Sequence, residues 1–225
     1  MKKHAGTGLC LAAGAAMVAA LTAALLVAPT ERTMGDVQRI FYFHLGSAAA
    51  AFASFTFVLV VSLLFILTRS PRFDDLAVAA AEVGVLFCTF VLVTGPLWAR
   101  PVWGKWWVWD PRLTTTLVLW FLYVGYLVLR SSVHGYRGAM AAAVFAVLAY
   151  VDVPIVYFSV RWWRGIHPIV LRRGGGMDPA MIPPLITSVA AFLLLAGVLI
   201  RERYHIERIQ SRAQSLEAML EEQLS

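Results

Sequence analysis

The sequence predicts an all-α, polytopic membrane protein with six transmembrane helices and a C-terminal cytoplasmic helix. Hydrophobic residues make up 60% of its 225 residues and charged residues only 14%, whereas about a quarter of the residues in a soluble domain are charged. A soluble core of this size could not bury so many apolar side chains. The composition therefore argues against a water-soluble enzyme.

Six apolar stretches are each long enough to cross a bilayer, which takes about 20 helical residues. Strand-like alternation is absent, and a backbone in lipid must satisfy its own hydrogen bonds, so each stretch is expected to be a helix. The first exceeds the apolar region of a signal peptide, which favours an uncleaved anchor. The expected spans are 8–28, 45–68, 76–98, 113–130, 138–160 and 182–200.

An even number of spans places both termini on one side of the membrane. Lys2 and Lys3 favour the cytoplasm for the N-terminus, since positive charge collects inside. Residues 201–225 are charged, and their apolar positions recur every three or four residues, as in an amphipathic helix. We therefore divide the chain into a six-helix transmembrane domain, 1–200, and a cytoplasmic amphipathic helix, 201–225.

The net charge of +6 does not indicate a nucleic-acid partner, because the 19 lysines and arginines are scattered between apolar runs. Cys10 and Cys88 offer no disulfide framework or zinc spacing, so both are expected to be packing residues. The outer loops are nevertheless rich in arginine, which an anionic ligand or insertion driven by the first helix would explain. Headgroup contacts are expected for Arg161, Arg164, Arg172 and Arg173.

Tryptophan is concentrated at one predicted membrane face, whereas an ordinary aromatic belt marks both interfaces. This face holds Trp98, Trp103, Trp106, Trp107, Trp109, Trp162 and Trp163, out of eight tryptophans in the chain. The asymmetry predicts a binding surface.

The loop between spans three and four is expected to be short and clamped. Gly95 and Pro96 are expected to end the incoming helix, and Asp110 with Pro111 to begin the outgoing one as N-cap and first-turn proline. On a helical turn, every third residue lies near one face. That face would carry Trp103, Trp106 and Trp109, with Trp107 beside them, while Gly104 would let a flat ligand approach the backbone.

Two histidines, His44 and His167, lie on the tryptophan-rich side, and the other three lie on the opposite side. Two neutral imidazoles can bind one iron from opposite faces of a porphyrin, whereas copper or zinc usually needs further protein ligands. The pattern suits a bis-histidine haem. Its propionates would need cations, for which the candidates are Arg39, Arg112 and Lys105.

Two carboxylates, Glu82 and Asp152, fall inside predicted spans, where they are expensive and usually face a bundle interior. Asp152 is expected to brace the site indirectly. Glu82 is expected near the cytoplasmic interface. A proton pathway would need more such groups than these two.

These residues resemble the haem-handling family of cytochrome c maturation, which is defined by a WGxxWxWD signature between two outward-facing histidines. Residues 103–110 match it at every signature position. Size, six spans and the order histidine, tryptophan loop, histidine resemble the small, CcmC-type members. The resemblance covers about residues 1–200, and the extension beyond Arg201 is longer than the family pattern.

The resemblance implies a non-enzymatic role in the inner (plasma) membrane: haem b, as a transported ligand, is delivered on the outer side to a membrane-anchored haem chaperone. It implies an ATP-driven transporter of two other subunits and a small single-span protein as partners. His44 and His167 would be the axial ligands, and Arg39 and Arg112 would hold propionates. The implied platform is Trp103, Gly104, Trp106, Trp107, Trp109 and Asp110.

Two other functions fit parts of the pattern. A membrane redox protein exchanging electrons between haem and quinone would need a second haem, with histidines inside the spans. A permease for another aromatic or anionic lipid would use the tryptophans and arginines but leave the histidines idle.

Overall fold

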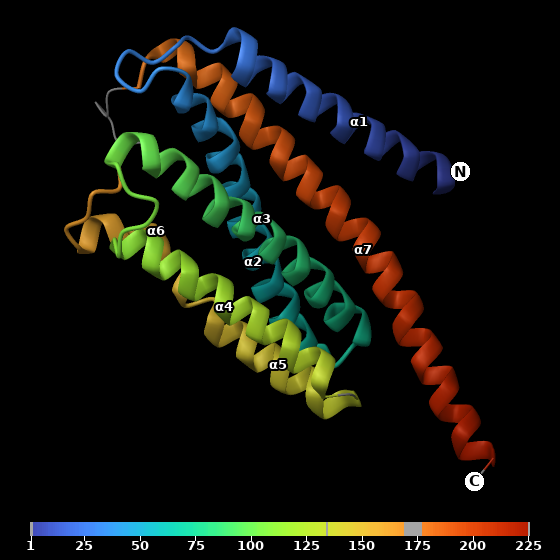
Figure 1. Ribbon diagram of the computed structural model, residues 1–225. Helices are drawn as coiled ribbons and strands as arrows, with labels where there is room; N and C mark the ends of the chain where they lie inside the picture. The colour runs from blue at the N-terminus through green and yellow to red at the C-terminus, as the bar shows by residue number, and fades with distance from the viewer. Residues whose placement is uncertain (1, 134, 169–176, 225) are drawn as a thin grey trace.

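The computed structural model describes residues 2–133, 135–168 and 177–224, which form helices joined by short connections (Figure 1). Six helical segments are long and apolar enough to cross a membrane, which confirms the predicted number of spans. They are Gly6–Val27, Asp36–Thr68, Pro71–Trp103, Pro111–Ser132, Gly135–Trp162 and Pro179–Gln210. The described part of the chain contains no β-strand, only an isolated bridge between Glu31 and Gly35.

The helices pack in three groups across the bundle (Figure 1). On one side, α1 (Lys2–Thr22) lies along α7 (Ile182–Leu224). The centre is formed by α2 (Ile40–Thr68) and α3 (Pro71–Trp103). The other side consists of α4 (Pro111–Ser132), α5 (Gly135–Ala149) and α6 (Asp152–Trp162). Three single turns, η1 (Ala23–Val27), η2 (Asp36–Arg39) and η3 (Pro179–Met181), flank α1, α2 and α7.

A tight hairpin joins α2 and α3. Arg69 adopts the left-handed conformation, with φ 56°, and donates its N–H to the carbonyl of Phe65 at 2.7 Å. Pro71 then begins α3, as proline is suited to the first helical turn. Below the hairpin, a Cβ on Gly84 would come within 2.5 Å of the ring of Phe55. The absence of a side chain at Gly84 therefore lets α2 and α3 approach closely.

The expectation that Gly95 and Pro96 end the third span is wrong. Helix α3 continues through Pro96 and Pro101 to Trp103. A proline removes one backbone donor without forcing a helix in a membrane protein to stop, because neighbouring structure can compensate. The helix ends at Gly104, whose φ of 72° forms a left-handed cap and whose N–H bonds to the carbonyl of Arg100 at 3.0 Å.

The fifth span is divided into two helices. α5 ends at Ala149, and α6 begins at Asp152 after a turn. Pro154 has no N–H to donate back to Tyr150, and the carbonyl of Tyr150 instead accepts from Val153 at 3.0 Å. The break places the buried carboxyl group of Asp152 at the start of α6.

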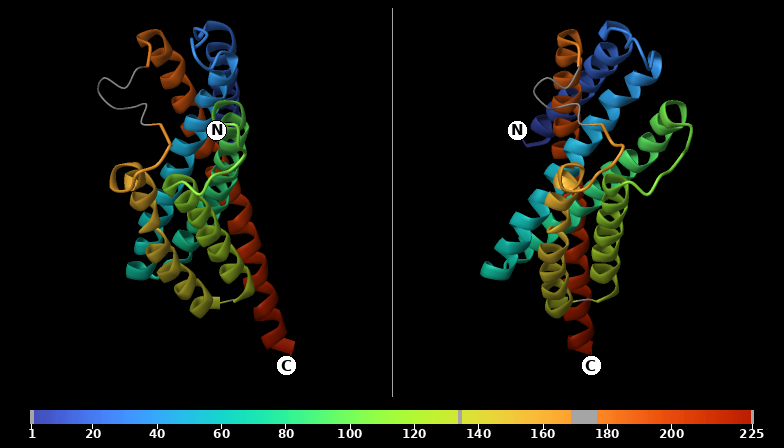
Figure 2. Two further views of the ribbon diagram at one scale, coloured as in Figure 1. Left: turned by 60° about the vertical axis from the view of Figure 1, so that its left-hand side comes forward. Right: turned by 90° about the vertical axis from the view of Figure 1, so that its left-hand side faces the viewer.

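The last span and the charged extension form one uninterrupted helix, α7, of 43 residues. Its C-terminal part extends beyond the other helices (Figure 2). Ile206, Ile209 and Leu216 of the expected apolar seam are exposed there. The guanidinium of Arg203, near the middle of α7, forms an ion pair with Glu82 of α3. Glu82 therefore ties α3 to α7.

Candidate functional site

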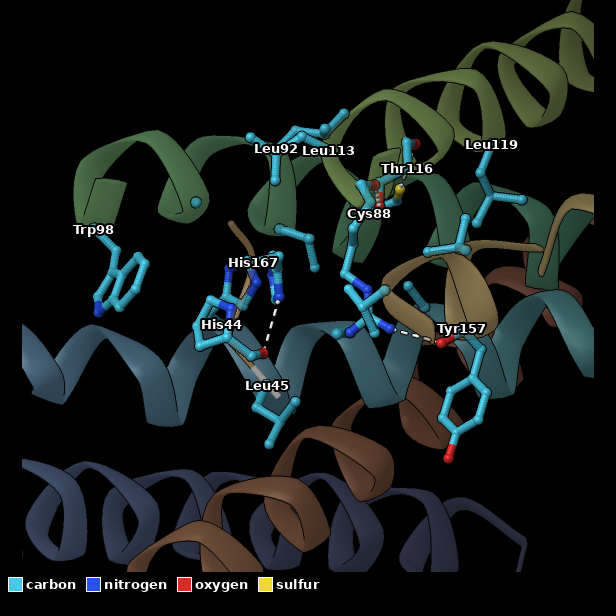
Figure 3. A pocket seen from close by; sticks show the side chains of 18 of the residues that line it. His44, Leu45, Cys88, Leu92, Trp98, Leu113, Thr116, Leu119, Tyr157 and His167 are labelled. Carbon is cyan, nitrogen blue, oxygen red and sulfur yellow. Dashed lines mark hydrogen bonds between the residues drawn. The ribbon is translucent and has the colours of Figure 1, made fainter. Parts of the chain in front are cut away.

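A cavity of about 400 Å³ lies between α2, α3, α4 and α6 at the tryptophan-rich end of the bundle. Its size falls within the range of small-molecule sites, about 300–1,000 Å³. His44 and His167 both line it and lie beside each other in Figure 3, although 123 positions separate them in the chain. At its deep end, Cys88, Thr116 and Leu119 form an almost closed floor. The two predicted ligand histidines thus share one cavity.

The protonation of His44 follows from its neighbour Thr94. The hydroxyl of Thr94 donates to the carbonyl of Phe90 at 2.6 Å. The Nδ1 atom of His44 lies 2.9 Å from the hydroxyl oxygen of Thr94. With the single hydroxyl proton pointing to Phe90, the contact is satisfied when Nδ1 of His44 is the donor. This assigns the proton of a neutral imidazole to Nδ1 and leaves the lone pair on Nε2 for a metal ion.

His167 has the same tautomer for a similar reason. Its Nδ1 lies 3.1 Å from the carbonyl oxygen of Pro168, which can only accept, so Nδ1 carries the proton. Burial, with the nearby positive charge of Arg112, lowers the pKa of His167 to about 4. The imidazole is therefore neutral at physiological pH, and its Nε2 is also available as a ligand.

Asp110 connects the tryptophan loop to the segment that carries His167. One carboxylate oxygen accepts from the N–H of Arg112 at 2.9 Å, which confirms the predicted N-cap of α4. The other accepts from the backbone N–H groups of Ile166, at 2.8 Å, and His167, at 3.4 Å. A Cβ on Gly165 would lie only 2.2 Å from this second oxygen. Asp110 thus positions His167 instead of lining the cavity.

Three buried N–H donors of the cavity lining have no hydrogen-bond partner among the described residues. They are Nε of Arg112 and the indole Nε1 atoms of Trp98 and Trp107. Arg112 is nevertheless held in place, because its Nη2 donates to the carbonyl of Tyr157 at 2.7 Å. Unsatisfied buried donors are costly. Their gathering in one cavity favours a ligand that carries acceptor oxygens.

The tryptophans do not share one helical face as expected, because the chain leaves the helix after Trp103 and residues 105–110 are non-helical. Trp103 and Trp107 line the cavity. Trp106 and Trp109 do not, and they are 57% and 76% exposed. Gly104 is the cap of α3 and does not line the cavity. The loop therefore has an inner and an outer set of indoles.

The predicted cations also separate into two groups. Arg112 lines the cavity, whereas Arg39 and Lys105 do not. Arg39 is already committed to the carbonyl oxygens of Ala24, at 2.8 Å, and Ala28, at 3.3 Å, where η1 ends. The carbonyl groups at the end of the π-helical turn η1 have no partner within the helix, and the guanidinium of Arg39 donates hydrogen bonds to them. Lys105 is exposed in the loop.

Two contributors to the site were not predicted from the sequence. Arg161, expected at the headgroups, lines the cavity, and Thr94 holds His44. Neither had a signal in the sequence, because their roles depend on partners in other helices. Trp98, which belongs to the predicted tryptophan-rich face, lines the cavity. Arg172 and Arg173 lie outside the described residues, and Arg164 is exposed.

The remaining expectations concern cysteines and acids. Cys88 is buried as expected, but Cys10 is exposed on α1 and is not packed within this chain. Among the described residues, no hydrogen bond joins Asp152 to the segment that carries His167, and one of its carboxyl oxygens has no partner. Among the residues that the structure describes, no three histidine, cysteine, aspartate or glutamate side chains form a metal-binding group. The histidine pair alone would leave most coordination positions of a metal to its ligand.

Comparison with known proteins shows the family of this chain. The family model of CcmC, heme exporter protein C, matches residues 2–219. The chain belongs to the heme exporter protein C family. Heme exporter protein C of Escherichia coli K12 is 38% identical over 174 residues, covering 76% of this chain and 71% of the relative.

Two further members of the CcmC family extend the comparison. Heme exporter protein C of Bradyrhizobium diazoefficiens is 35% identical over 197 residues, which cover 86% of this chain and 75% of the relative. A ccmC-like mitochondrial protein of cytochrome c biosynthesis from Marchantia polymorpha is 34% identical over 181 residues, covering 80% and 77%. The similarity thus spans most of the six-helix bundle.

Proposed function

We propose that this chain binds haem between His44 and His167 and passes it on during cytochrome c maturation, without catalysing a reaction. One observation carries the proposal: both imidazoles line one cavity, and the Nδ1 atom of each lies within hydrogen-bond distance of an oxygen, an arrangement that leaves both Nε2 atoms for a ligand. A porphyrin supplies four ligands to iron and leaves two opposite positions for histidine. The names of the relatives agree with this ligand.

The haem propionates would meet the unpaired donors of the cavity lining. Arg112 offers its buried Nε, and Trp98 and Trp107 offer indole N–H groups. Arg161 adds a second charge at the cavity wall. Charge-assisted hydrogen bonds of this kind are the stronger ones. Arg39 and Lys105 are not part of this proposal because neither lines the cavity.

The outer indoles suit the hand-over step. Trp106 and Trp109 are exposed beside the cavity, and exposed aromatic residues are typical of interaction surfaces. We assign them to contact with a membrane-anchored haem chaperone on the outer side of the inner membrane. Both termini would then be cytoplasmic, and an ATP-driven transporter with a small single-span subunit would supply the energy.

The test of haem ligation is an absorbance spectrum of the purified protein. The His44→Ala/His167→Ala variant should lose the low-spin spectrum of bis-histidine haem. His205→Ala is the matched control, since His205 is exposed on α7 outside the cavity. An unchanged spectrum in the double variant would refute the ligand assignment.

Two titrations separate this function from its alternatives. Metal-free porphyrin should bind much more weakly than haem; equal binding would instead favour a permease that ignores the histidines. A haem content of two per chain would favour the electron carrier. An electron carrier of this kind would need a second pair of histidines inside the spans. The described spans contain two histidines, His44 and His205, which are too few for two haems.

A further inference from the structure

One face of α4 leads from the floor of the cavity to the opposite end of the bundle. Its positions recur at alternating intervals of three and four residues, so they lie in a row. The row consists of Thr116, Leu119, Tyr123, Tyr126 and Arg130. The first two line the cavity floor (Figure 3), and the next two are fully buried. The face is therefore enclosed by the other helices.

This row contains polar atoms with no partner. The hydroxyl groups of Tyr123 and Tyr126 are buried and make no hydrogen bond among the described residues. Neither does one carboxyl oxygen of Asp152, at the break between α5 and α6. Buried polar atoms are nearly always satisfied. Within a membrane span, outside solvent is not available to them.

These groups are neighbours that form no hydrogen bond with one another. The rings of Tyr123 and Tyr126 are 6.5 Å apart between centroids. Asp152 interacts electrostatically with Tyr123, and Tyr126 with the Arg130–Asp74 pair and Glu207. Arg130 binds Asp74 through two nitrogens, at 3.0 and 2.7 Å. The row thus reaches a cluster of charged groups where α3, α4 and α7 meet.

Unsatisfied buried polar groups are the usual hosts of internal water. We infer that water molecules bridge Asp152, Tyr123 and Tyr126 in a hydrogen-bonded chain, which we call the polar file. This polar file lets Asp152 exchange protons with the membrane face opposite the histidines. Each tyrosine hydroxyl can accept one hydrogen bond and donate another, as a relay requires. The inference does not rest on haem binding.

The file is closed toward the cavity. Leu119 is fully buried, and the thiol of Cys88 lies 3.9 Å from the carbonyl of Thr116. Cys88 lines the cavity and also interacts electrostatically with Asp152, so its buried thiol stands between the two. A file open at one end connects Asp152 to one side of the membrane without leaking protons across it.

Two groups among the described residues interact electrostatically with Asp152, and neither is a cation. They are Cys88 from α3 and Tyr123 from α4, which in turn lies near Tyr150 of the turn after α5. The hydroxyl of Tyr150 is already engaged with Thr56 of α2 at 3.1 Å. An ionised carboxylate without a cation is expensive at this depth, so Asp152 holds a proton that the file can deliver or remove.

Infrared spectroscopy of the full chain in lipid nanodiscs tests the file. A protonated carboxyl band should be absent in Asp152→Asn and should shift when D₂O is added. Tyr126→Phe should slow that shift about tenfold, as expected for one lost hydrogen bond in the path. Tyr42→Phe is the matched control: Tyr42 also has a buried, unpartnered hydroxyl, but it packs in the separate cluster near α1 and α7.

Two results would overturn the inference. One is a carboxyl band that persists in Asp152→Asn. The other is a D₂O shift that is as fast in Tyr126→Phe as in Tyr42→Phe. Should Asp152→Asn fail to fold, the comparison between the two tyrosine variants still decides the matter, because both keep Asp152.

Discussion

The carboxylate of Asp110 accepts a hydrogen bond from the backbone N–H of Ile166 at 2.8 Å, across 56 positions of sequence. The same oxygen reaches the N–H of His167. The last residue of the tryptophan signature therefore fixes where the second histidine stands. In this structure the signature is a positioning element as much as a binding surface.

Asp110→Asn should weaken haem binding while leaving the fold intact. An amide has one acceptor oxygen, so it can cap α4 or hold Ile166 but cannot do both. Loss of such a supporting bond typically costs about 10–100-fold in metal affinity. Haem titration measures this. Asp178→Asn is the control, because Asp178 caps η3 outside the cavity; equal affinities of the two variants would contradict the role of Asp110.

Gly165→Ala should displace the His167 segment. The added Cβ would lie 2.2 Å from the carboxylate of Asp110, so either the carboxylate or the segment must move. We expect a loss of haem affinity comparable to that of Asp110→Asn. Gly14→Ala offers the comparison, because nothing lies within 4 Å of a Cβ at Gly14. Normal haem binding by Gly165→Ala would show that the contact is dispensable.

Thr94→Val should allow the His44 imidazole to carry its proton on either ring nitrogen. Valine keeps the shape of threonine but cannot accept from Nδ1, whereas Thr94→Ser keeps the acceptor. In ¹⁵N nuclear magnetic resonance spectra of the haem-free protein, wild type and Thr94→Ser should show His44 protonated at Nδ1. Thr94→Val should show a mixture and bind haem about tenfold more weakly. A single Nδ1 tautomer in Thr94→Val would refute this assignment.

His167 should become protonated only at low pH, because its pKa lies below that of an ordinary histidine. Because burial and Arg112 lower its pKa to about 4 from an ordinary 6.5, the unfolded chain binds more protons than the folded one between these values. Its contribution to stability is therefore complete above pH 6.5 and is lost as the pH falls toward 4.

Nuclear magnetic resonance titration of the His167 ring measures this pKa directly. Arg112→Gln removes a nearby positive charge, so the pKa should rise toward the ordinary value without reaching it, since burial remains the larger cause. A pKa near 6.5 in the unmodified protein would show that the ring is more open to solvent than the structure indicates.

Local sequence was sufficient for the features that depend on local physics. Apolar length predicted the six spans, and Asp110 with Pro111 predicted the start of α4. The pairing of His44 with His167 was also readable once the spans were counted, because alternate loops share a membrane face. These features need no knowledge of which helix packs against which.

The remaining features depend on packing between helices. Pro96 did not end α3, since a proline limits a helix only when nothing compensates for the lost bond. Thr94 meets His44 across 50 positions, and Arg39 finds the carbonyls of Ala24 and Ala28 instead of the cavity. No periodicity in one segment specifies such partners. The division of the tryptophans into inner and outer sets likewise follows from the non-helical path after Gly104.

The unbroken helix α7 has a mechanical consequence. With 43 residues it measures about 65 Å at 1.5 Å per residue, roughly twice the hydrocarbon thickness of a bilayer. A rod without a hinge transmits tilt from one end to the other. A protein that binds its C-terminal turns would therefore also move its N-terminal turns, which follow η3 at the opposite membrane surface.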